Sequence, residues 1–489
     1  MNRELLKLNP ELARNFKLEL TSQRLVLMPV ILVLLAGLIL SFGGNDFSMG
    51  SGWNDYDKLC QFSLIAFLLI TGIWGAKSAA DGILDEYNNK TWDWQRMSTI
   101  SPMKMTIGKL FGSTIYNWYG GIICLFIYFV SSILSNHHSM LVSFVSMLNV
   151  ILTAIALQGF TILSSLMQIR KGDGRRKIKS TSAIFLAIFG LSFIVNGFNE
   201  NQSRIFGVAN NLYWYKINFG IFGSLLSPVF FCSWIVAGLY RSFRTEFQYE
   251  NGLKWWVIFL ISLAIYLTGY FVRPNYLGVE KILVASAIAA SIAIGYFFIT
   301  WIMAMAEPKE FIPIREALLS WKNKNYRKFY TQAPLWLVGL IFSAGMSVLT
   351  CIVFLMCRSS NGSSAYLDQR GDFLIQAFFD QMNSNIAAYA LVPIAAFFFL
   401  LRDVSLILLI NLSGKRKRAD GTALLLLVVL YVIAPVLVRD SNIEWIFYPL
   451  NTEGNFLMLL SPFLQASMLI YYLVLLWRNL EEKHTENLS

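Results

Sequence analysis

The sequence predicts an all-α polytopic membrane protein with about twelve transmembrane helices, arranged as two parallel six-helix repeats. The first observation is composition: 56% of the 489 residues are hydrophobic and only 14% are charged, whereas about a quarter of a soluble chain is charged. The second is that apolar runs of roughly 20 residues, enough for a helix to cross a bilayer, recur along the whole chain. The third is a four-residue segment that occurs twice, nearly half the chain apart.

The apolar runs give the order of the predicted spans. We expect spans near residues 25–43, 60–80, 112–134, 140–168, 181–198, 219–240, 255–272, 282–305, 333–357, 385–411, 422–438 and 456–477. The chain is thereby divided into a surface helix (1–24), a first half (25–240), a connector (241–254), a second half (255–477) and a tail (478–489). The segments between spans are too short for a separate aqueous domain.

The basic residues predict the orientation of the chain. Most of the 40 Lys and Arg residues fall in segments on the same side of the membrane as the N-terminus, including Arg170–Lys179 and Lys415–Arg418. Basic segments stay on the cytoplasmic side, so we expect both termini in the cytoplasm and the protein in a plasma (bacterial inner) membrane. The net charge of +11 is then a topology signal, and no nucleic-acid partner is expected.

The segment before the first span predicts a helix lying on the membrane surface. Asn9 suits an N-cap, Pro10 suits the first helical position, and Glu11 complements the helix dipole. Apolar residues recur at i+4 spacing from Leu8 to Leu20, with charged residues on other faces. A solvated tail is the alternative.

The repeated segment divides the predicted spans into two halves. Leu225–Pro228 and Leu459–Pro462 both read Leu-Leu-Ser-Pro. Each copy follows a basic loop, a short span and an aromatic outer segment, in that order. Because each half contains an even number of spans, the halves are expected to be parallel repeats about an axis along the membrane normal.

The sequence lacks the motifs that an enzyme of the common classes carries. It has no phosphate-binding loop, no GxSxG, no HExxH and only 3 histidines. We therefore expect no catalytic residue, no cofactor and no metal site in this chain.

The segment between the second and third spans carries a recognisable order of motifs. Glu86 comes first and is followed by Thr91, then Ser101-Pro102, and then Gly108-Lys109, which leads into the third span. This order resembles that of the permeases of type-two-class ATP-binding-cassette (ABC) exporters, and the N-terminal surface helix resembles the elbow helix of that family. The family's usual glycine before the threonine is Lys90 here.

The resemblance implies that a short helix in this segment docks on a separate ATPase subunit, which binds and hydrolyses the ATP. Tryptophans would anchor the helix and charged residues would orient it; the residues expected to do so are Asp85, Glu86, Thr91, Trp92, Trp94 and Arg96. The alternative is that the tryptophans are membrane-interface residues and the charges are a solvated face.

The second half has a corresponding segment, from Glu307 to Thr331. Ile314, Leu318 and Trp321 lie at i, i+4 and i+7, the spacing of an amphipathic helix. The docking residues expected here are Glu307, Arg315, Leu318 and Trp321. Because one chain would carry both docking helices, we expect one permease chain with two ATPase copies.

Polar residues within spans are candidates for a translocation path. Arg402 and Asp403 interrupt a long apolar run, and Asn149 and Gln158 lie in the corresponding span of the first half. Adjacent helical positions point about 100° apart, so we expect Arg402 and Asp403 to pair with other helices rather than with each other. Hydrogen bonding that only holds the bundle together is an equally good explanation of these residues.

Three functions compete at this stage. The first is an ABC exporter permease that works by ATP-driven alternating access. The second is an ion-gradient-driven secondary transporter with two six-span halves, which would favour a long central loop and buried acidic residues. The third is a lipid- or glycan-modifying membrane enzyme, which would favour clustered Asp, Glu or His in loops. The short connector and the scarcity of such clusters favour the first.

Overall fold

The computed structural model describes most of the chain. The described residues are 9–42, 55–97, 100–135, 139–171, 213–272, 281–359, 386–413, 419–438, 446–447 and 457–486. The chain forms two compact units. Unit 1 comprises Met1–Leu212 and Asn218–Asn251, and unit 2 comprises Tyr213–Ile217 and Gly252–Ser489.

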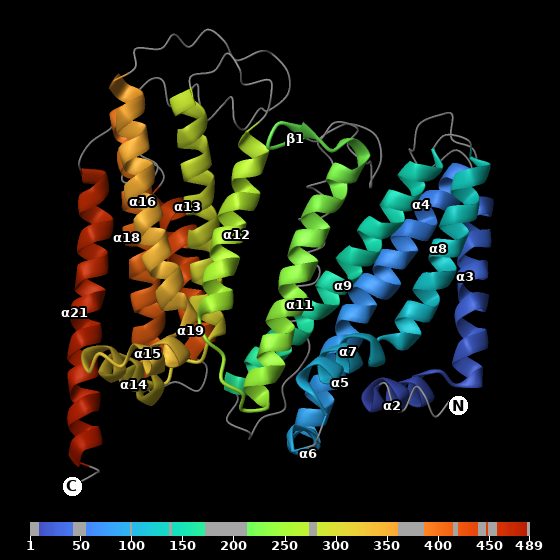
Figure 1. Ribbon diagram of the computed structural model, residues 1–489, viewed down its shortest axis with the longest axis horizontal. Helices are drawn as coiled ribbons and strands as arrows, with labels where there is room; N and C mark the ends of the chain where they lie inside the picture. The colour runs from blue at the N-terminus through green and yellow to red at the C-terminus, as the bar shows by residue number, and fades with distance from the viewer. Residues whose placement is uncertain are drawn as a thin grey trace. The chain divides into compact units, whose positions relative to one another are not determined.

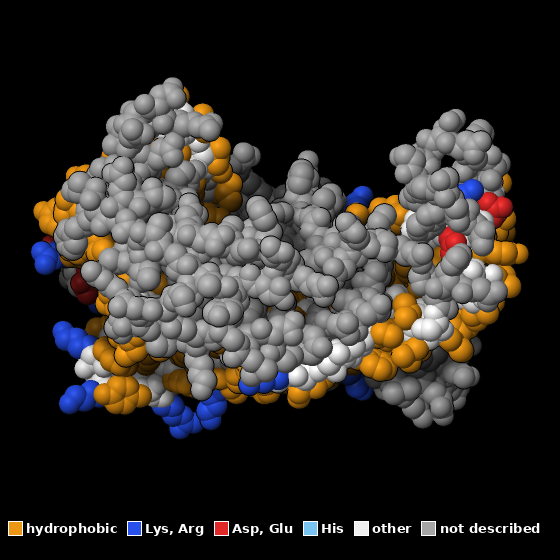
Figure 2. Space-filling model, turned by 90° about the horizontal axis from the view of Figure 1, so that it is seen from above, with side chains coloured by type: hydrophobic (Ala, Val, Ile, Leu, Met, Phe, Trp, Pro, Cys, Tyr) orange, Lys and Arg blue, Asp and Glu red, His pale blue; other side chains and the backbone are white. Residues whose placement is uncertain are grey.

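The described residues are almost entirely helical, which confirms the predicted all-α membrane architecture. They contain 10 helices long and apolar enough to cross a membrane, or up to 11 if the bent pair Pro10–Glu19 and Ser22–Gly37 forms one span. Each predicted span coincides with a helix except 181–198, which lies outside the described residues. Hydrophobic side chains cover much of the described surface visible in Figure 2, as expected where lipid is the solvent.

Unit 1 contains the first group of helices (Figure 1). In chain order they are α2 (Pro10–Glu19), α3 (Ser22–Phe42), α4 (Asp55–Phe67), η1 (Leu68–Trp74), α5 (Gly75–Asn88), α6 (Trp92–Arg96), α7 (Pro102–Gly112), α8 (Ile115–Leu134), α9 (Met140–Lys171), η2 (Gly220–Leu225) and α11 (Leu226–Glu246). The segments α4, η1 and α5 form one continuous span of 34 residues. The short helix α6 follows the last residue of this span, and we call this end of unit 1 the α6 end.

Unit 2 contains the remaining helices. They are α12 (Lys254–Phe271), α13 (Lys281–Ala306), α14 (Phe311–Lys322), α15 (Tyr326–Gln332), α16 (Leu335–Ser359), α18 (Ile386–Leu412), α19 (Ala419–Val428), η4 (Val429–Ile433), α20 (Ala434–Val438) and α21 (Leu457–Glu486). In Figure 1, α14 and α15 lie crosswise to the long helices of this unit.

The strands β1 (Tyr213–Trp214) and β2 (Ile217–Asn218) form a two-stranded hairpin. Its turn residues Tyr215 and Lys216 have φ of 49° and 64°. The Trp214 indole and the Tyr215 backbone N–H donate to carbonyls near the end of α12. The Tyr215 bond therefore satisfies the Gly269 carbonyl, one of those that the end of a helix leaves free.

The N-terminal helix begins as the sequence predicts. The Asn9 side chain accepts hydrogen bonds from the backbone N–H groups of Glu11 and Leu12, and Pro10 is the first helical residue. The chain then bends by 68° between α2 and α3. The predicted N-cap is confirmed, and α2 is a separate helix that meets α3 at this bend.

A π-helical turn interrupts the long span of unit 1 at η1. Such a turn leaves backbone carbonyls without their usual helical partners. The Asn117 amide donates to the Ile70 carbonyl at 3.1 Å, and the Gln158 amide donates to the Thr71 carbonyl at 2.7 Å. Helices α8 and α9 thus complete the hydrogen bonding of this turn.

Gly121 allows α8 to approach the π-helical turn. A Cβ atom at Gly121 would lie 2.2 Å from Thr71 Oγ1 and 2.9 Å from Phe67 Cε2. We expect Gly121→Ala to destabilise the protein by about 1–3 kcal/mol, because a methyl group does not fit without moving both neighbours. Thermal unfolding of the purified protein measures this loss.

Gly345→Ala is the matched control, since nothing lies within 4 Å of a Cβ atom at Gly345 in α16. Alanine favours a helix interior by about 0.5–1 kcal/mol over glycine. The control should therefore be neutral or stabilising. Equal effects of the two substitutions would show that the close approach at Gly121 is not tight.

Candidate functional site

The candidate site is built on the turn that ends α5. The Thr91 backbone N–H donates to the Glu86 carbonyl at 2.9 Å, and the Lys90 N–H donates to the Tyr87 carbonyl at 3.0 Å, the bond pattern of a Schellman turn. Lys90 has φ of 60°, a conformation that glycine adopts more readily. Lys90 therefore takes the left-handed conformation of the turn at the position where the resembled family carries glycine.

A buried charge cluster joins this turn to the N-terminal helix. Lys109 from α7 is only 2% exposed, and its Nζ donates to Glu11 Oε1 at 2.8 Å and to Glu86 Oε2. Arg14 Nη2 closes the cluster, at 2.9 Å from Glu11 Oε1 and 2.7 Å from Glu86 Oε1. Two carboxylates and two cations therefore neutralise one another where α2, α5 and α7 meet. We call Glu11, Arg14, Glu86 and Lys109 the charge cluster.

Two glycines of α7 allow α2 to come close enough for these contacts. A Cβ atom at Gly108 would lie 2.8 Å from Glu11 Cβ, and one at Gly112 would lie 2.6 Å from the Asn15 amide. The Asn9 side chain also donates to the Lys104 carbonyl at 2.7 Å. The Gly-Lys step of the sequence therefore provides both the space and the cation for the α2–α7 contact.

The two tryptophans of α6 occupy different environments. Trp92 is 2% exposed and packs against Phe243 of α11, with ring centroids 6.3 Å apart. Trp94 is 75% exposed, and Met97, which follows α6, is 72% exposed. The prediction that Trp92 is a surface anchor is therefore wrong, because its side chain completes the core of unit 1. Trp94 is open to solvent or to a partner.

Arg96 fixes α6 to two further helices. Its Nε donates to the Glu246 carbonyl at 3.0 Å at the end of α11. The buried Glu246 carboxylate in turn accepts from Arg170 Nε at 2.7 Å at the end of α9. The predicted orienting residue Arg96 thus acts within unit 1, and α6 is held by α5, α9 and α11.

The other predicted residues of this segment have simpler positions. Asp85 is exposed on α5. The Thr91 hydroxyl donates to the Glu86 carbonyl at 3.1 Å and stabilises the turn. Sequence reasoning did not assign Glu11, Arg14 or Glu246 to the site; the signal available was that they are charged residues at helix ends beside predicted spans.

The corresponding segment of unit 2 uses a similar turn. Lys324 has φ of 56°, the Asn325 N–H donates to the Ser320 carbonyl at 2.9 Å, and the Lys324 N–H donates to the Trp321 carbonyl at 3.0 Å. An Asn-Lys pair lies within each turn, at Asn89-Lys90 and Asn323-Lys324. The two pairs are separated by the same number of residues as the two Leu-Leu-Ser-Pro segments.

Two of the predicted docking residues of unit 2 are engaged within that unit. The Glu307 carboxylate accepts from the Leu335 N–H at 3.0 Å and from the Trp336 N–H at 3.3 Å, and so caps the start of α16. Arg315 Nε lies 3.7 Å from Glu481 Oε1 of α21. The prediction that these two residues dock a partner is not supported by their contacts, whereas Leu318 and Trp321 are exposed.

The polar candidates in unit 1 hold helices together. Gln158 donates to the Thr71 carbonyl and accepts from Trp118 Nε1 at 3.1 Å, so it connects α9 to η1 and α8. The Asn149 amide donates to Ser224 Oγ at 3.0 Å, while its buried carbonyl oxygen has no hydrogen-bond partner among the described residues. The contacts of Gln158 favour the structural explanation of that residue.

Arg402 and Asp403 bond to each other, contrary to prediction. Arg402 Nε and Nη2 lie 2.9 and 2.8 Å from Asp403 Oδ1. Adjacent helical positions point in different directions, but the arginine side chain is long enough to fold back to the neighbouring carboxylate. A buried charge is stabilised by the nearest opposite charge, which here is Asp403. Bonds to other helices are also present, from Arg402 Nη1 to Gln465 Oε1 at 2.8 Å and from Tyr431 Oη to Asp403 Oδ2 at 2.7 Å.

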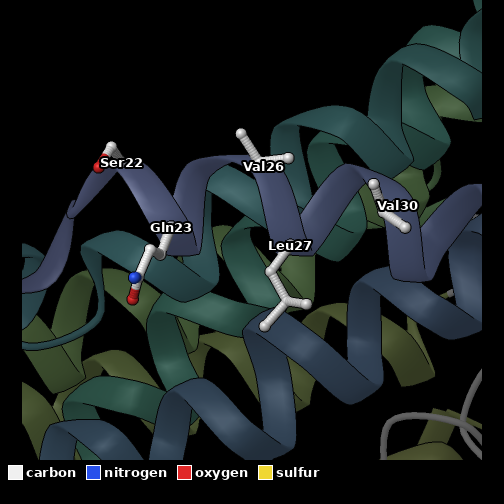
Figure 3. A pocket seen from close by; sticks show the side chains of 5 residues that line it. All are labelled: Ser22, Gln23, Val26, Leu27 and Val30. Carbon is white, nitrogen blue, oxygen red and sulfur yellow. The ribbon is translucent and has the colours of Figure 1, made fainter.

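A groove along α3 is the pocket shown in Figure 3. It is lined by Ser22, Gln23, Val26, Leu27 and Val30. All five residues come from one helix, and the three apolar ones are exposed. This surface resembles a lipid-facing helix rather than an enclosed binding site. Among the described residues, no group of three or more His, Cys, Asp and Glu side chains could hold a metal ion.

Comparison with known proteins gives no relative. No protein family, curated protein or solved structure matches this chain. The contacts described above therefore carry the functional argument.

The charge cluster makes a direct prediction about stability. We expect Lys109→Met to lower the free energy of unfolding by about 3–5 kcal/mol, because it removes the buried cation that joins Glu11 and Glu86 to α7 and leaves them with the half-exposed Arg14. Arg24→Gln is the control, since it removes an exposed cation that pairs with Glu19 and should cost less than about 1 kcal/mol. Chemical unfolding in detergent measures both, and losses of equal size would contradict the burial argument.

The Arg402–Asp403 pair predicts a different pattern. Arg402→Ala should lower stability by about 3–5 kcal/mol, because Asp403 keeps a buried charge, whereas the double substitution Arg402→Met/Asp403→Leu should restore much of the loss. If the pair is structural, the double variant also retains transport. A stable double variant without transport would instead assign the pair to the translocation path.

Proposed function

We propose that this chain is the membrane-spanning permease subunit of an ABC exporter and that a separate ATPase subunit docks on the α6 end of unit 1. The chain would provide the translocation path and lie in a plasma membrane with the α6 end in the cytoplasm. ATP would bind and be hydrolysed on the partner, and alternating access would move substrate between the halves.

The observation that carries this proposal is the contrast between the tip of α6 and its base. Trp94 and Met97 present exposed apolar side chains, which suit an anchor in a partner's groove. Behind them, the charge cluster and the Arg96–Glu246 bond fix α6 to the long helices of unit 1. A pull on α6 would therefore reach the spans instead of deforming a loose loop.

One observation favours a second candidate, an ion-gradient-driven secondary transporter. Asp403 is a buried carboxylate within a predicted span, where ionisable groups often belong to an ion or proton pathway. Against this, both of its oxygens accept hydrogen bonds, from Arg402 and Tyr431. Transport driven by an ion gradient without any ATPase, and abolished by Asp403→Asn, would favour this candidate.

The test of the proposal is co-purification of the chain with ABC ATPase subunits from the same organism, expressed together with it. We expect a stable complex whose substrate-stimulated ATP turnover falls at least about tenfold for Trp94→Ala, the loss of one interface anchor worth about 2 kcal/mol. Trp74→Ala is a matched control, because Trp74 is an exposed tryptophan within the predicted span.

Native mass measurement of the same complex tests its composition: the two docking segments expected from the sequence predict one permease chain with two ATPase copies, whereas docking through the α6 end alone provides one ATPase contact per chain. Two permease chains in the complex would overturn that composition. A chain that binds no ATPase under any condition would overturn the proposed function itself.

A further inference from the structure

The turn that joins α14 to α15 carries a concentrated positive charge. All residues from Trp321 to Lys328 are exposed. The segment reads Trp-Lys-Asn-Lys-Asn-Tyr-Arg-Lys, with four cations, two aromatic residues and no acidic residue. We call residues 321–328 the basic tip.

The cations of the basic tip are largely uncompensated. Lys328 Nζ lies 3.8 Å from Glu316 Oε2, and both side chains are about half exposed. Among the described residues, no carboxylate lies within 4 Å of the cationic groups of Lys322, Lys324 or Arg327. The corresponding turn of unit 1 differs, since Asp93 and Asp85 accompany its cations. The shape of the turn therefore does not require positive charge, and the charge of the basic tip calls for a separate explanation.

The connections of the tip keep it beside the membrane. Helix α14 begins soon after the predicted span of α13 ends, and only Ala333-Pro334 separate α15 from the long apolar helix α16. Glu307, which directly follows α13, caps the start of α16, so both ends of the α14–α15 segment are held together. Phe311 packs against Trp477 of α21 with ring centroids 4.7 Å apart, so α14 is also fixed to a long helix. The tip cannot extend far from the membrane surface.

The side chains around the tip suit a membrane interface. Trp321 is 57% exposed and packs edgewise against Tyr326, with centroids 5.8 Å apart. Trp and Tyr concentrate at the level of lipid headgroups. Exposed Ile312, Leu318 and Leu319 continue an apolar surface along α14, as in helices that lie in the interface.

We propose that the basic tip binds the headgroups of anionic lipids and holds the α14 end of unit 2 on the membrane surface. The cations meet headgroup phosphates, while the rings of Trp321 and Tyr326 rest at the headgroup level. This inference requires only that the chain spans a membrane, so it does not rest on the proposed ATPase partner. It assigns Trp321 to the lipid surface rather than to a protein groove.

The test uses the full chain purified in a neutral detergent and titrated with short-chain phosphatidylglycerol or phosphatidylcholine, with bound lipid counted by native mass spectrometry. We expect tighter binding of phosphatidylglycerol, and a loss of about 10- to 25-fold in that affinity for Lys324→Gln/Arg327→Gln, since each cation near a lipid surface contributes about fivefold. The preference should weaken as salt is raised.

The matched control is Lys77→Gln/Lys104→Gln, which removes two exposed lysines from unit 1. It should change the affinity less than the tip variant by a clear margin, and both variants should unfold at the temperature of the unmodified chain. Equal losses in the two variants, or no preference for the anionic lipid, would overturn the proposal. A tip variant that keeps its lipid preference but loses an ATPase partner would also overturn it, in favour of protein docking.

Discussion

The burial of the Lys109 ammonium group is the constraint on which the α6 end of unit 1 depends. An amine with 2% exposure is tolerated only where opposite charge and hydrogen bonds replace water. The two carboxylates that do so come from α2 and from the end of α5. If either helix moves away from α7, the buried Lys109 ammonium group loses one of its two carboxylate partners. The electrostatics therefore fix α2 to two helices, α5 and α7, that lie about 60 residues or more further along the chain.

The rest of the α6 end follows from that constraint. Because Glu86 is held, the turn at Lys90 starts α6 in a fixed direction, and Trp92 enters the core beside Phe243. Arg96 donates to the Glu246 carbonyl, and Arg170 donates to the Glu246 carboxylate. Glu246 thus connects α6 to the ends of α9 and α11. Under the proposed function, a movement of the small exposed helix α6 would be transmitted to the long helices of unit 1.

Much of the fold could be predicted because the solvent is lipid. Long apolar runs must be helices there, since every backbone polar group needs a partner within the chain. The N-cap at Asn9 was equally predictable, because capping depends on a local choice of residue. The short-range motif order also indicated that Glu86 and Lys109 belong to one segment.

The burial and the contact partners of individual side chains could not be predicted in the same way. Trp92 and Trp94 are two positions apart, and only the packing of α11 decides that the first is buried. The pairing of Arg402 with Asp403 depends on the reach of the arginine side chain and on Gln465 and Tyr431, which arrive from distant helices. Such contacts are set by tertiary structure, and the pattern of one segment does not contain them.

The two units hold their corresponding turn segments in place by different contacts. In unit 1 the segment after the second predicted span is locked by a buried charge cluster, whereas in unit 2 Glu307 caps α16 and α14 packs against α21. Unit 2 also places four cations on its turn, where unit 1 has an exposed Trp94 and mixed charge. Under the two proposals the turns have unequal roles, since α6 binds a protein groove and the basic tip binds lipid headgroups.

Hydrogen–deuterium exchange in the membrane-reconstituted chain tests the central claim most directly, by comparing Lys109→Met with the unmodified protein. The account predicts that loss of this one cation in α7 speeds exchange in both α2 and the segment from Lys90 to Met97, because the charge cluster holds both. Faster exchange in α2 with unchanged protection of the α6 segment would contradict it, and would show that α6 is held independently of the buried charges.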